Sequence, residues 1–109
     1  MILFLTLGLA IADPTLEQAR TCRAHMEIMI EDTARHGGPV AGPTWFISDW
    51  WTLKAVEAGA PDDDRAAMAA ATTRLEAVGM AEPEQFRAER QACVDTAVEA
   101  GAVPGVGPE

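Results

Sequence analysis

The stretch LEQARTCRAHMEIMI, residues 16–30, decides the fold, because its apolar residues recur at the spacing of an α-helix. The repeat passes through Cys22, so this cysteine is expected on the apolar face of the helix. Thr15 and Gln18 form the T-x-x-Q pattern of a capping box and predict the start of the helix. The sequence HGGP at 36–39 predicts its end.

The second of the two cysteines, Cys93, lies on the apolar face of another predicted helix. That helix is expected to begin at the sequence EPE, residues 82–84, and to end at Gly101. A disulfide between Cys22 and Cys93 would hold these two helices side by side. It would close a loop of about 70 residues, which in the chain-entropy model stabilises the fold by about 4 kcal/mol.

Two further helices are predicted between these, over residues 44–58 and from the three aspartates at 62–64 to Gly79. Nothing in the sequence alternates as a strand does, and no internal repeat occurs. We therefore expect an all-α fold, a small four-helix bundle closed by one disulfide between the first and last helices. The bundle is expected to form a single domain over 13–101, followed by a flexible tail at 102–109.

The first twelve residues, MILFLTLGLAIA, carry no charge and end in the A-x-A pattern of a signal-peptide cleavage site. Cleavage is expected after Ala12, and a periplasmic or extracellular location would suit a disulfide. The segment is too short to span a bilayer, which takes about 20 apolar residues. The alternative is an apolar N-terminal segment packed on the domain.

The charge of the chain excludes some classes of partner. Its 17 acidic and 8 basic residues give a net charge of −9, and no basic run occurs. Such a chain repels nucleic acid phosphates and anionic lipid surfaces. The expected partner is a protein, with no nucleic acid and no membrane insertion after processing.

All three tryptophans lie in TWFISDWW, residues 44–51. Trp50 shares one helical stripe with Phe46 and Leu53 and is expected in the core. A second apolar stripe, through Trp51, lies beside the first, so together they are wider than the usual buried face of a surface helix.

This surplus apolar surface leaves two interpretations open. Either the helix is central and covered on both flanks, or part of the surplus surface stays exposed and binds a partner. The candidate partner-binding residues are Trp45, Asp49 and Trp51.

The residues Cys22, His25, Met26 and Met29 place soft metal ligands at helical spacings of three and four. Thiolate, imidazole and thioether together suit Cu(I). Methionines at this spacing are more often core residues, and a disulfide-bonded Cys22 has no thiolate to offer. Neither a metal nor any other cofactor is therefore expected.

Catalytic motifs with recognisable spacing are missing from the sequence, including C-x-x-C, H-E-x-x-H, G-x-S-x-G and a glycine-rich phosphate loop. Ser48 is the only serine. We expect a binding protein rather than an enzyme, acting as an inhibitor or immunity-type factor on an envelope protein. The alternatives are a periplasmic stress chaperone and, less favoured, a Cu(I) carrier.

Overall fold

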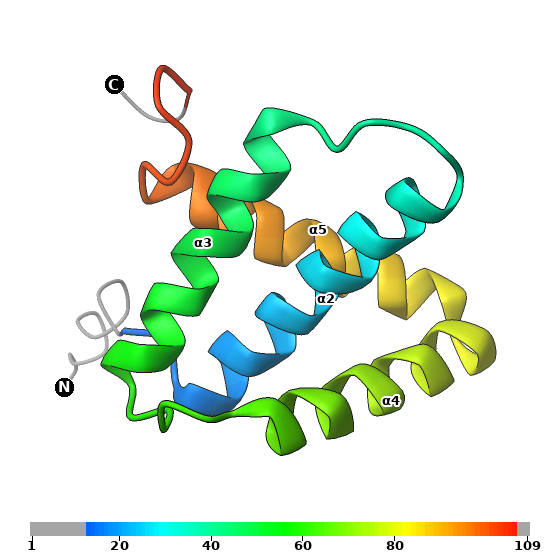
Figure 1. Ribbon diagram of the computed structural model, residues 1–109, viewed down its shortest axis with the longest axis horizontal. Coiled ribbons are helices and arrows are strands. Elements are labelled where there is room, and N and C mark those ends of the chain that lie inside the picture. The colour runs from blue at the N-terminus through cyan, green and yellow to red at the C-terminus, as the bar shows by residue number, and fades with distance from the viewer. Residues whose placement is uncertain (1–12, 107–109) are drawn as a thin grey trace, which may run out of the picture.

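The computed structural model describes residues 13–106, and every regular element in that range is an α-helix. Helix α2 spans Leu16–Arg35, α3 Gly42–Glu57, α4 Arg65–Ala81 and α5 Pro83–Glu99 (Figure 1). The predicted all-α bundle of four helices is therefore confirmed. The expected signal segment lies outside the described residues.

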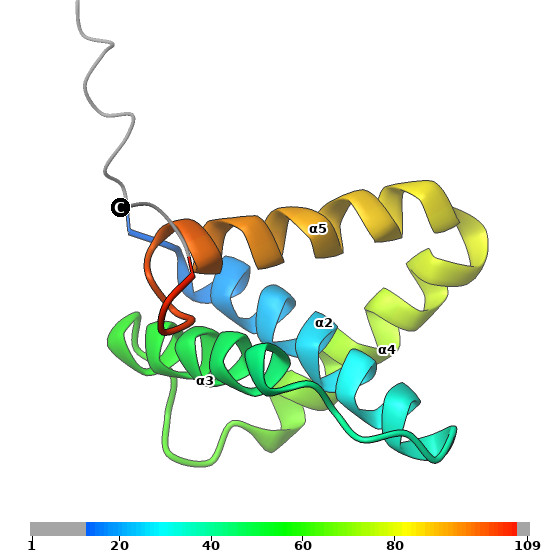
Figure 2. The same cartoon turned by 90° about the horizontal axis from the view of Figure 1, so that it is seen from above.

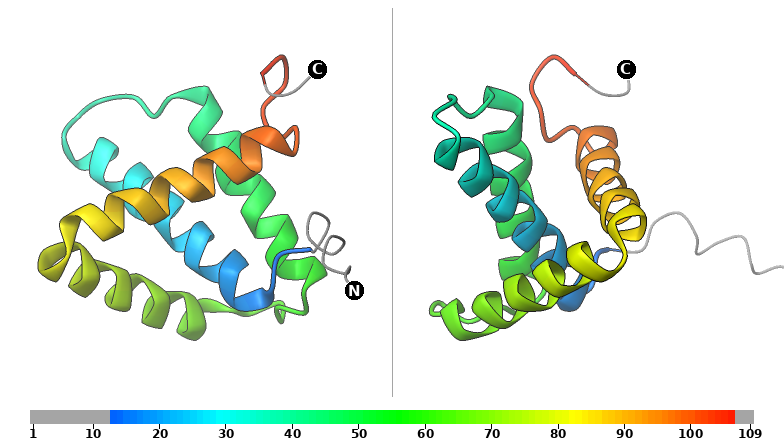
Figure 3. Two further views of the ribbon diagram at one scale, coloured as in Figure 1. Left: turned by 180° about the vertical axis from the view of Figure 1, so that it is seen from behind. Right: turned by 90° about the vertical axis from the view of Figure 1, so that its right-hand side faces the viewer.

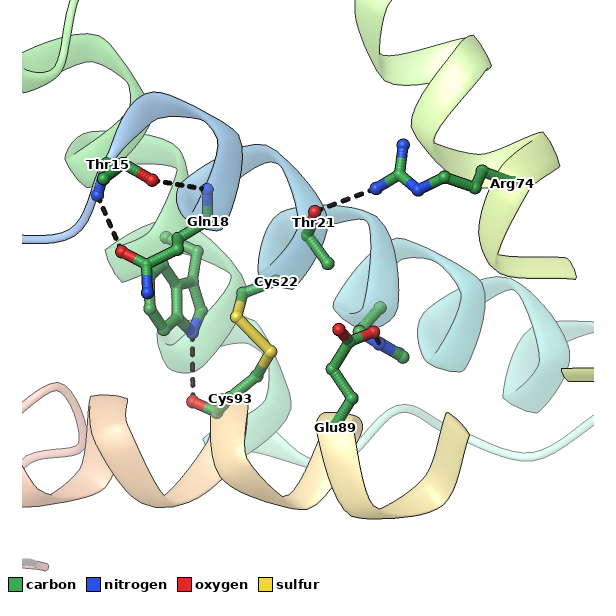
Figure 4. Close-up of a disulfide and its surroundings, with 9 residues drawn as sticks. Thr15, Gln18, Thr21, Cys22, Arg74, Glu89 and Cys93 are labelled. Atoms are coloured by element: carbon green, nitrogen blue, oxygen red, sulfur yellow. Dashed lines mark hydrogen bonds and ion pairs between the residues drawn. A yellow bond between two sulfur atoms is a disulfide. The ribbon is translucent and has the colours of Figure 1, made fainter. Parts of the chain in front are cut away.

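A disulfide joins Cys22 on α2 to Cys93 on α5, with 5.4 Å between the two Cα atoms (Figure 4). It links the first and last helices, as predicted. The indole N–H of Trp51 on α3 donates a hydrogen bond to the carbonyl oxygen of Cys93 at 3.1 Å. Three helices are thus connected at one point, and the disulfide is compatible with an oxidising compartment.

The predicted capping box at the start of α2 is present. The Thr15 hydroxyl accepts a hydrogen bond from the Gln18 backbone N–H at 3.0 Å, and the Gln18 side-chain oxygen accepts one from the Thr15 N–H at 2.9 Å. Helix α3 begins at Gly42, earlier than expected, with Pro43 in its first turn. Proline is tolerated there because the first N–H groups of a helix have no partner within the helix.

Gly79 lies inside α4, which continues to Ala81, so the expected helix end at Gly79 is wrong. A Cβ atom at this position would lie 3.3 Å from Cδ1 of Phe86 on α5. Only Glu82 separates the two helices in the chain. The glycine is therefore explained by the close packing of the α4–α5 hairpin rather than by a turn.

Helix α2 lies at the centre of the molecule, and the other three helices all pack against it. Helices α5 and α3 lie on opposite sides of α2 (Figure 2). Seen from behind, α5 crosses α2 and reaches from α3 to α4 (Figure 3). Within residues 13–106, α3 and α4 are the one pair of helices that do not pack against each other.

The core consists of two clusters on α2. The larger cluster joins α2 to α3, α5 and the segment after α5, and its buried members are Ala19, Met26, Ile47, Trp51, Ala55, Cys93, Ala97 and Val103. The smaller cluster joins α2 to α4, and its buried members are Ala24, Met68, Ala71 and Leu75. Alanine recurs in both clusters, so a few large side chains supply most of the buried apolar area.

Helix α3 turns the stripe of Trp51 and Ala55 toward the core, and Trp51 is only 3% exposed. The other stripe faces outward: Phe46 and Leu53 are about half exposed, and Trp50 is partly buried. The expectation that Trp50 lies in the core is therefore confirmed only in part: it is partly buried and packs against the larger core cluster, whereas its stripe neighbours Phe46 and Leu53 are exposed. The inner stripe has smaller residues, which let α3 approach α2 more closely than a row of three large side chains would.

Trp50 occupies the edge of the core. Its ring meets that of Trp51 edge to face with 4.8 Å between centroids, and the Lys54 ammonium lies 5.1 Å from its centroid. One part of the indole is thus covered by Trp51, and another lies under a solvated cation.

The packed domain extends past the expected boundary at Gly101. Val103 is buried in the larger core cluster, and the Ala102 N–H donates to the Ala97 carbonyl oxygen at 3.0 Å. Among the described residues, no helix has both the length and the apolar character needed to cross a membrane.

Candidate functional site

A hollow lies between α3 and α4, which do not touch. It is an open groove of about 1090 Å³, and side chains of α2 also line it. In Figure 1 the two helices diverge from the loop that connects them. We call this hollow the α3–α4 groove.

One side of α3 forms a wall of the groove. The lining residues of this wall recur three or four positions apart, as neighbours on one helix face do; they are Trp45, Ser48, Thr52 and Val56. The opposite wall, on α4, is built from Arg65, Met68, Ala69, Thr72 and Thr73. Both walls mix apolar side chains with short hydroxyls, a composition that suits a peptide surface better than a small apolar ligand.

The charge in the groove is predominantly negative, since five carboxylates and two guanidinium groups line it. Three of the carboxylates are in ion pairs: Glu27 with Arg23 at 3.0 Å, Asp63 with Arg65 at 3.0 Å and Asp64 with Arg20 at 2.6 Å. Within residues 13–106, Glu31 and Asp62 form no ion pair. These two side chains therefore leave uncompensated negative charge in the groove.

The ion pair between Asp64 and Arg20 fixes the end of the groove. Arg20 donates two hydrogen bonds to the Asp64 carboxylate, at 3.0 and 2.6 Å, and the Asp64 side chain is almost fully buried. The hydrogen bond from Arg20 holds the pKa of Asp64 below its usual value. The contribution of this ion pair to the stability of the fold is therefore complete at neutral pH and is lost as the pH falls below about 4.

The three predicted partner-binding residues lie in different environments. Trp45 is 49% exposed and lines the groove. Asp49 is exposed but lies outside the groove. Trp51 is buried, and its indole N–H is hydrogen-bonded to the carbonyl oxygen of Cys93, so Trp51 is a core residue. Only Trp45 combines exposure with a concave setting.

The four residues considered for Cu(I) belong to the interior of the bundle. Cys22 is in the disulfide, His25 and Met26 are fully buried, and Met29 packs against the larger core cluster. Among the described residues, no group of three or more His, Cys, Asp or Glu side chains is placed to hold a metal ion.

His25 is a buried polar residue between α2 and α5. Its Nε2 lies 2.8 Å from Oε1 of Glu89, its ring centroid lies 4.9 Å from that of Phe86, and its Nδ1 has no hydrogen-bond partner. Burial lowers the pKa of His25, and the hydrogen bond and charge of Glu89 oppose this only in part. Neutral His25 donates from Nε2 to the carboxylate, whereas a proton on Nδ1 would be buried without an acceptor.

We expect the free energy of unfolding to decrease as the pH falls from about 6.5 through the lowered pKa of His25. In that range the unfolded chain binds a proton that the folded chain takes up less readily. Urea unfolding at a series of pH values from 7.5 to 5 measures the slope of the free energy of unfolding against pH. His25→Leu is the control and should flatten it; an equal slope in both proteins would contradict the assignment.

Most of the groove could not be predicted from the sequence. The hydroxyls of Ser48 and Thr52, spaced four residues apart, marked a side of α3 with short polar groups. That signal identified neither the opposite wall on α4 nor the floor on α2, because both depend on how the helices pack.

No family model, characterised protein or solved structure matches this chain.

Proposed function

We propose that this protein is a small exported binding protein that recognises a protein of the cell envelope through the α3–α4 groove. It acts there as an inhibitor or immunity-type factor, by occupying its target rather than by chemistry. The observation that carries the proposal is Trp45, a half-exposed indole on the wall of this open groove. Exposed tryptophan is enriched among the residues that dominate binding energy at protein interfaces.

Export is supported by two independent features. Residues 1–12 have the uncharged apolar run and the A-x-A ending of a secretory signal. The disulfide between Cys22 and Cys93 is a bond that persists in oxidising compartments and is rare in the cytosol.

Binding is favoured over hydrolysis because, among the described residues, neither histidine is hydrogen-bonded to Ser48. Ser48, the only serine, lines the groove from α3. His25 is fully buried and hydrogen-bonded to Glu89 on α5, and His36, after the end of α2, has its Nδ1 2.8 Å from the Asp32 carbonyl oxygen. A nucleophile and its base must lie within hydrogen-bonding reach of each other, whereas both histidines contact groups other than Ser48.

Trp45→Ala is expected to weaken capture of the partner by about 2 kcal/mol or more, roughly thirtyfold in Kd. The partner is first identified by quantitative pull-down from an envelope extract with the oxidised protein as bait. Titration calorimetry with the purified partner then gives the Kd for each variant. Gene neighbourhood is an independent check, since an immunity factor is expected beside its toxin.

Phe46→Ala is the matched control, because Phe46 is exposed to a similar extent on the same helix but lies outside the groove. It should leave the Kd unchanged. If Phe46→Ala weakens capture and Trp45→Ala does not, the binding surface is the outer face of α3 and the groove is not the site.

A second candidate function, a periplasmic chaperone, is favoured by that outer face. Phe46 and Leu53 are about half exposed there, and exposed apolar side chains bind unfolded chains of many sequences. A chaperone would suppress the aggregation of several unrelated clients and lose this activity in Phe46→Ser/Leu53→Ser. An inhibitor would instead capture one partner in a one-to-one complex.

A further inference from the structure

Building on the proposed function, we infer that the segment which occupies the α3–α4 groove is a basic amphipathic helix of the partner. Its apolar face packs along Trp45 and Val56, and its Lys or Arg side chains pair with Glu31 and Asp62.

The groove has the form of a helix-binding site. Helices α3 and α4 both pack on α2 but not on each other, so α2 forms a floor between two helical walls. The α3 wall runs from Trp45 to Val56, about 16 Å at the rise of an α-helix. That length accommodates about three turns of a partner helix, in the helix-in-groove mode of recognition.

The apolar side chains in the groove provide the contact surface for such a helix. Ile28 contributes from the floor, Trp45 and Val56 from one wall and the exposed Ala69 from the other, where the neighbouring Met68 is buried in the smaller core cluster. These residues are distributed over three helices, so an apolar ridge with residues at i, i+3 or i+4 and i+7 would touch each side of the groove.

The charges of the groove select a basic partner. Glu31 and Asp62 have no ion pair within the described chain, whereas both guanidinium groups of the groove, on Arg23 and Arg65, are already paired. A cationic segment gains attraction to these carboxylates and is steered toward a chain of net charge −9. An acidic segment, or a second copy of this acidic chain, is repelled.

Glu31 and Asp62, which have no ion pair among the described residues, also suggest how far apart the basic residues of the partner helix lie. Arg20 holds Asp64, and with it the loop that contains Asp62, near the N-terminal end of α2. Glu31 lies on the same helix eleven residues beyond Arg20, about 16 Å along the axis. Basic residues about eleven positions apart, which share one face of a partner helix, would reach both carboxylates.

The test uses three synthetic peptides and the oxidised full-length protein. The first is an alanine-based helix of about 14 residues with a leucine ridge and two lysines about eleven positions apart. The second replaces the lysines with glutamate, and the third scrambles the order and destroys the amphipathic face. Titration calorimetry gives each Kd, and amide chemical-shift changes locate the contact surface.

We expect the lysine peptide to bind in the groove at least about tenfold more tightly than either control, with an affinity that falls as salt is added. Trp45→Ala should weaken its binding at least about tenfold. The double variant Glu31→Lys/Asp62→Lys should reverse the preference and bind the glutamate peptide more tightly. Such a charge swap alters only exposed or loop positions, and circular dichroism of each variant confirms that the helices form.

Two results would overturn the inference and leave the proposed function standing. In one, the captured partner depends on Trp45 while the lysine and glutamate peptides bind equally well. In the other, the charge-swapped protein keeps its preference for lysine. The inference would also be overturned by chemical-shift changes confined to the outer face of α3, or by self-association that buries the groove. If Trp45→Ala captures the partner as well as the wild-type protein does, the proposed function itself is overturned.

Discussion

Trp51→Ala is expected to lower the free energy of unfolding by about 3–5 kcal/mol, the range for truncating a buried aromatic side chain. Trp51 is the largest side chain in the larger core cluster and is 3% exposed. Its removal leaves a cavity between α2, α3 and α5. It also leaves the carbonyl oxygen of Cys93 without the indole N–H that now donates to it. Urea unfolding followed by far-UV circular dichroism measures the change.

Two other tryptophan variants make the comparison specific. Trp45→Ala, at a half-exposed site, should change stability by less than about 1 kcal/mol. Trp51→Phe retains most of the ring volume but loses the hydrogen bond, and should fall between the two. If Trp45→Ala is the more damaging of the two alanine variants, the orientation of α3 described above is incorrect.

Loss of the disulfide is expected to have an effect of similar size. Cys22 and Cys93 are 71 positions apart, and closing so long a loop restricts the unfolded chain by about 4 kcal/mol in the chain-entropy model. Removing a native disulfide from a small secreted domain typically costs about 2–5 kcal/mol. The core here contains many alanines, which bury little area each, so this is a large share of the total stability.

The double variant Cys22→Ala/Cys93→Ala removes the bond and leaves no thiol. Its urea unfolding is compared with that of the wild-type protein with and without a reductant. Reduced wild type and the double variant should match, and reductant should leave the double variant unchanged. A wild-type midpoint that does not move on reduction would show that the bond contributes little.

The bundle and its disulfide were predictable because the signals for them are local. The apolar repeat of residues 16–30 places Cys22 on the inner face of one helix, and the same argument places Cys93. The capping box at Thr15 and Gln18 is also local and formed as expected. The helices and the placing of each cysteine on an apolar face depend on residues within a few turns of one another. The pairing itself spans 71 positions and was predictable because the chain has only two cysteines.

The orientation of α3 was not predictable from its apolar pattern, since hydrophobic side chains occur on both of its stripes. The buried side combines the large Trp51 with the small Ser48 and Ala55, so α3 can lie close to α2. The exposed stripe has the large side chains of Phe46 and Leu53, which would hold α3 farther from α2. Side-chain size, rather than hydrophobicity, was the informative signal.

The long-range contacts of the groove also could not be predicted from the sequence. The aspartates at 62–64 were expected to favour the start of α4 by charge alone. Asp64 does stand at the N-cap position, yet its side chain makes no capping bond and instead pairs with Arg20, 44 positions earlier. Nothing local in the sequence marks such a pair, because it exists only once α2 and the α3–α4 loop have come together.

The absence of packing between α3 and α4 has a consequence for hydrogen exchange. Either helix can detach from α2 and α5 without breaking a contact to the other, so openings below the level of global unfolding are available on both sides of the groove. Helix α2 contacts all three other helices and is covalently linked to α5. The backbone amides of α2 near Cys22 are thus the ones whose exchange requires most of the molecule to unfold, and the groove can widen while that part of the protein stays protected.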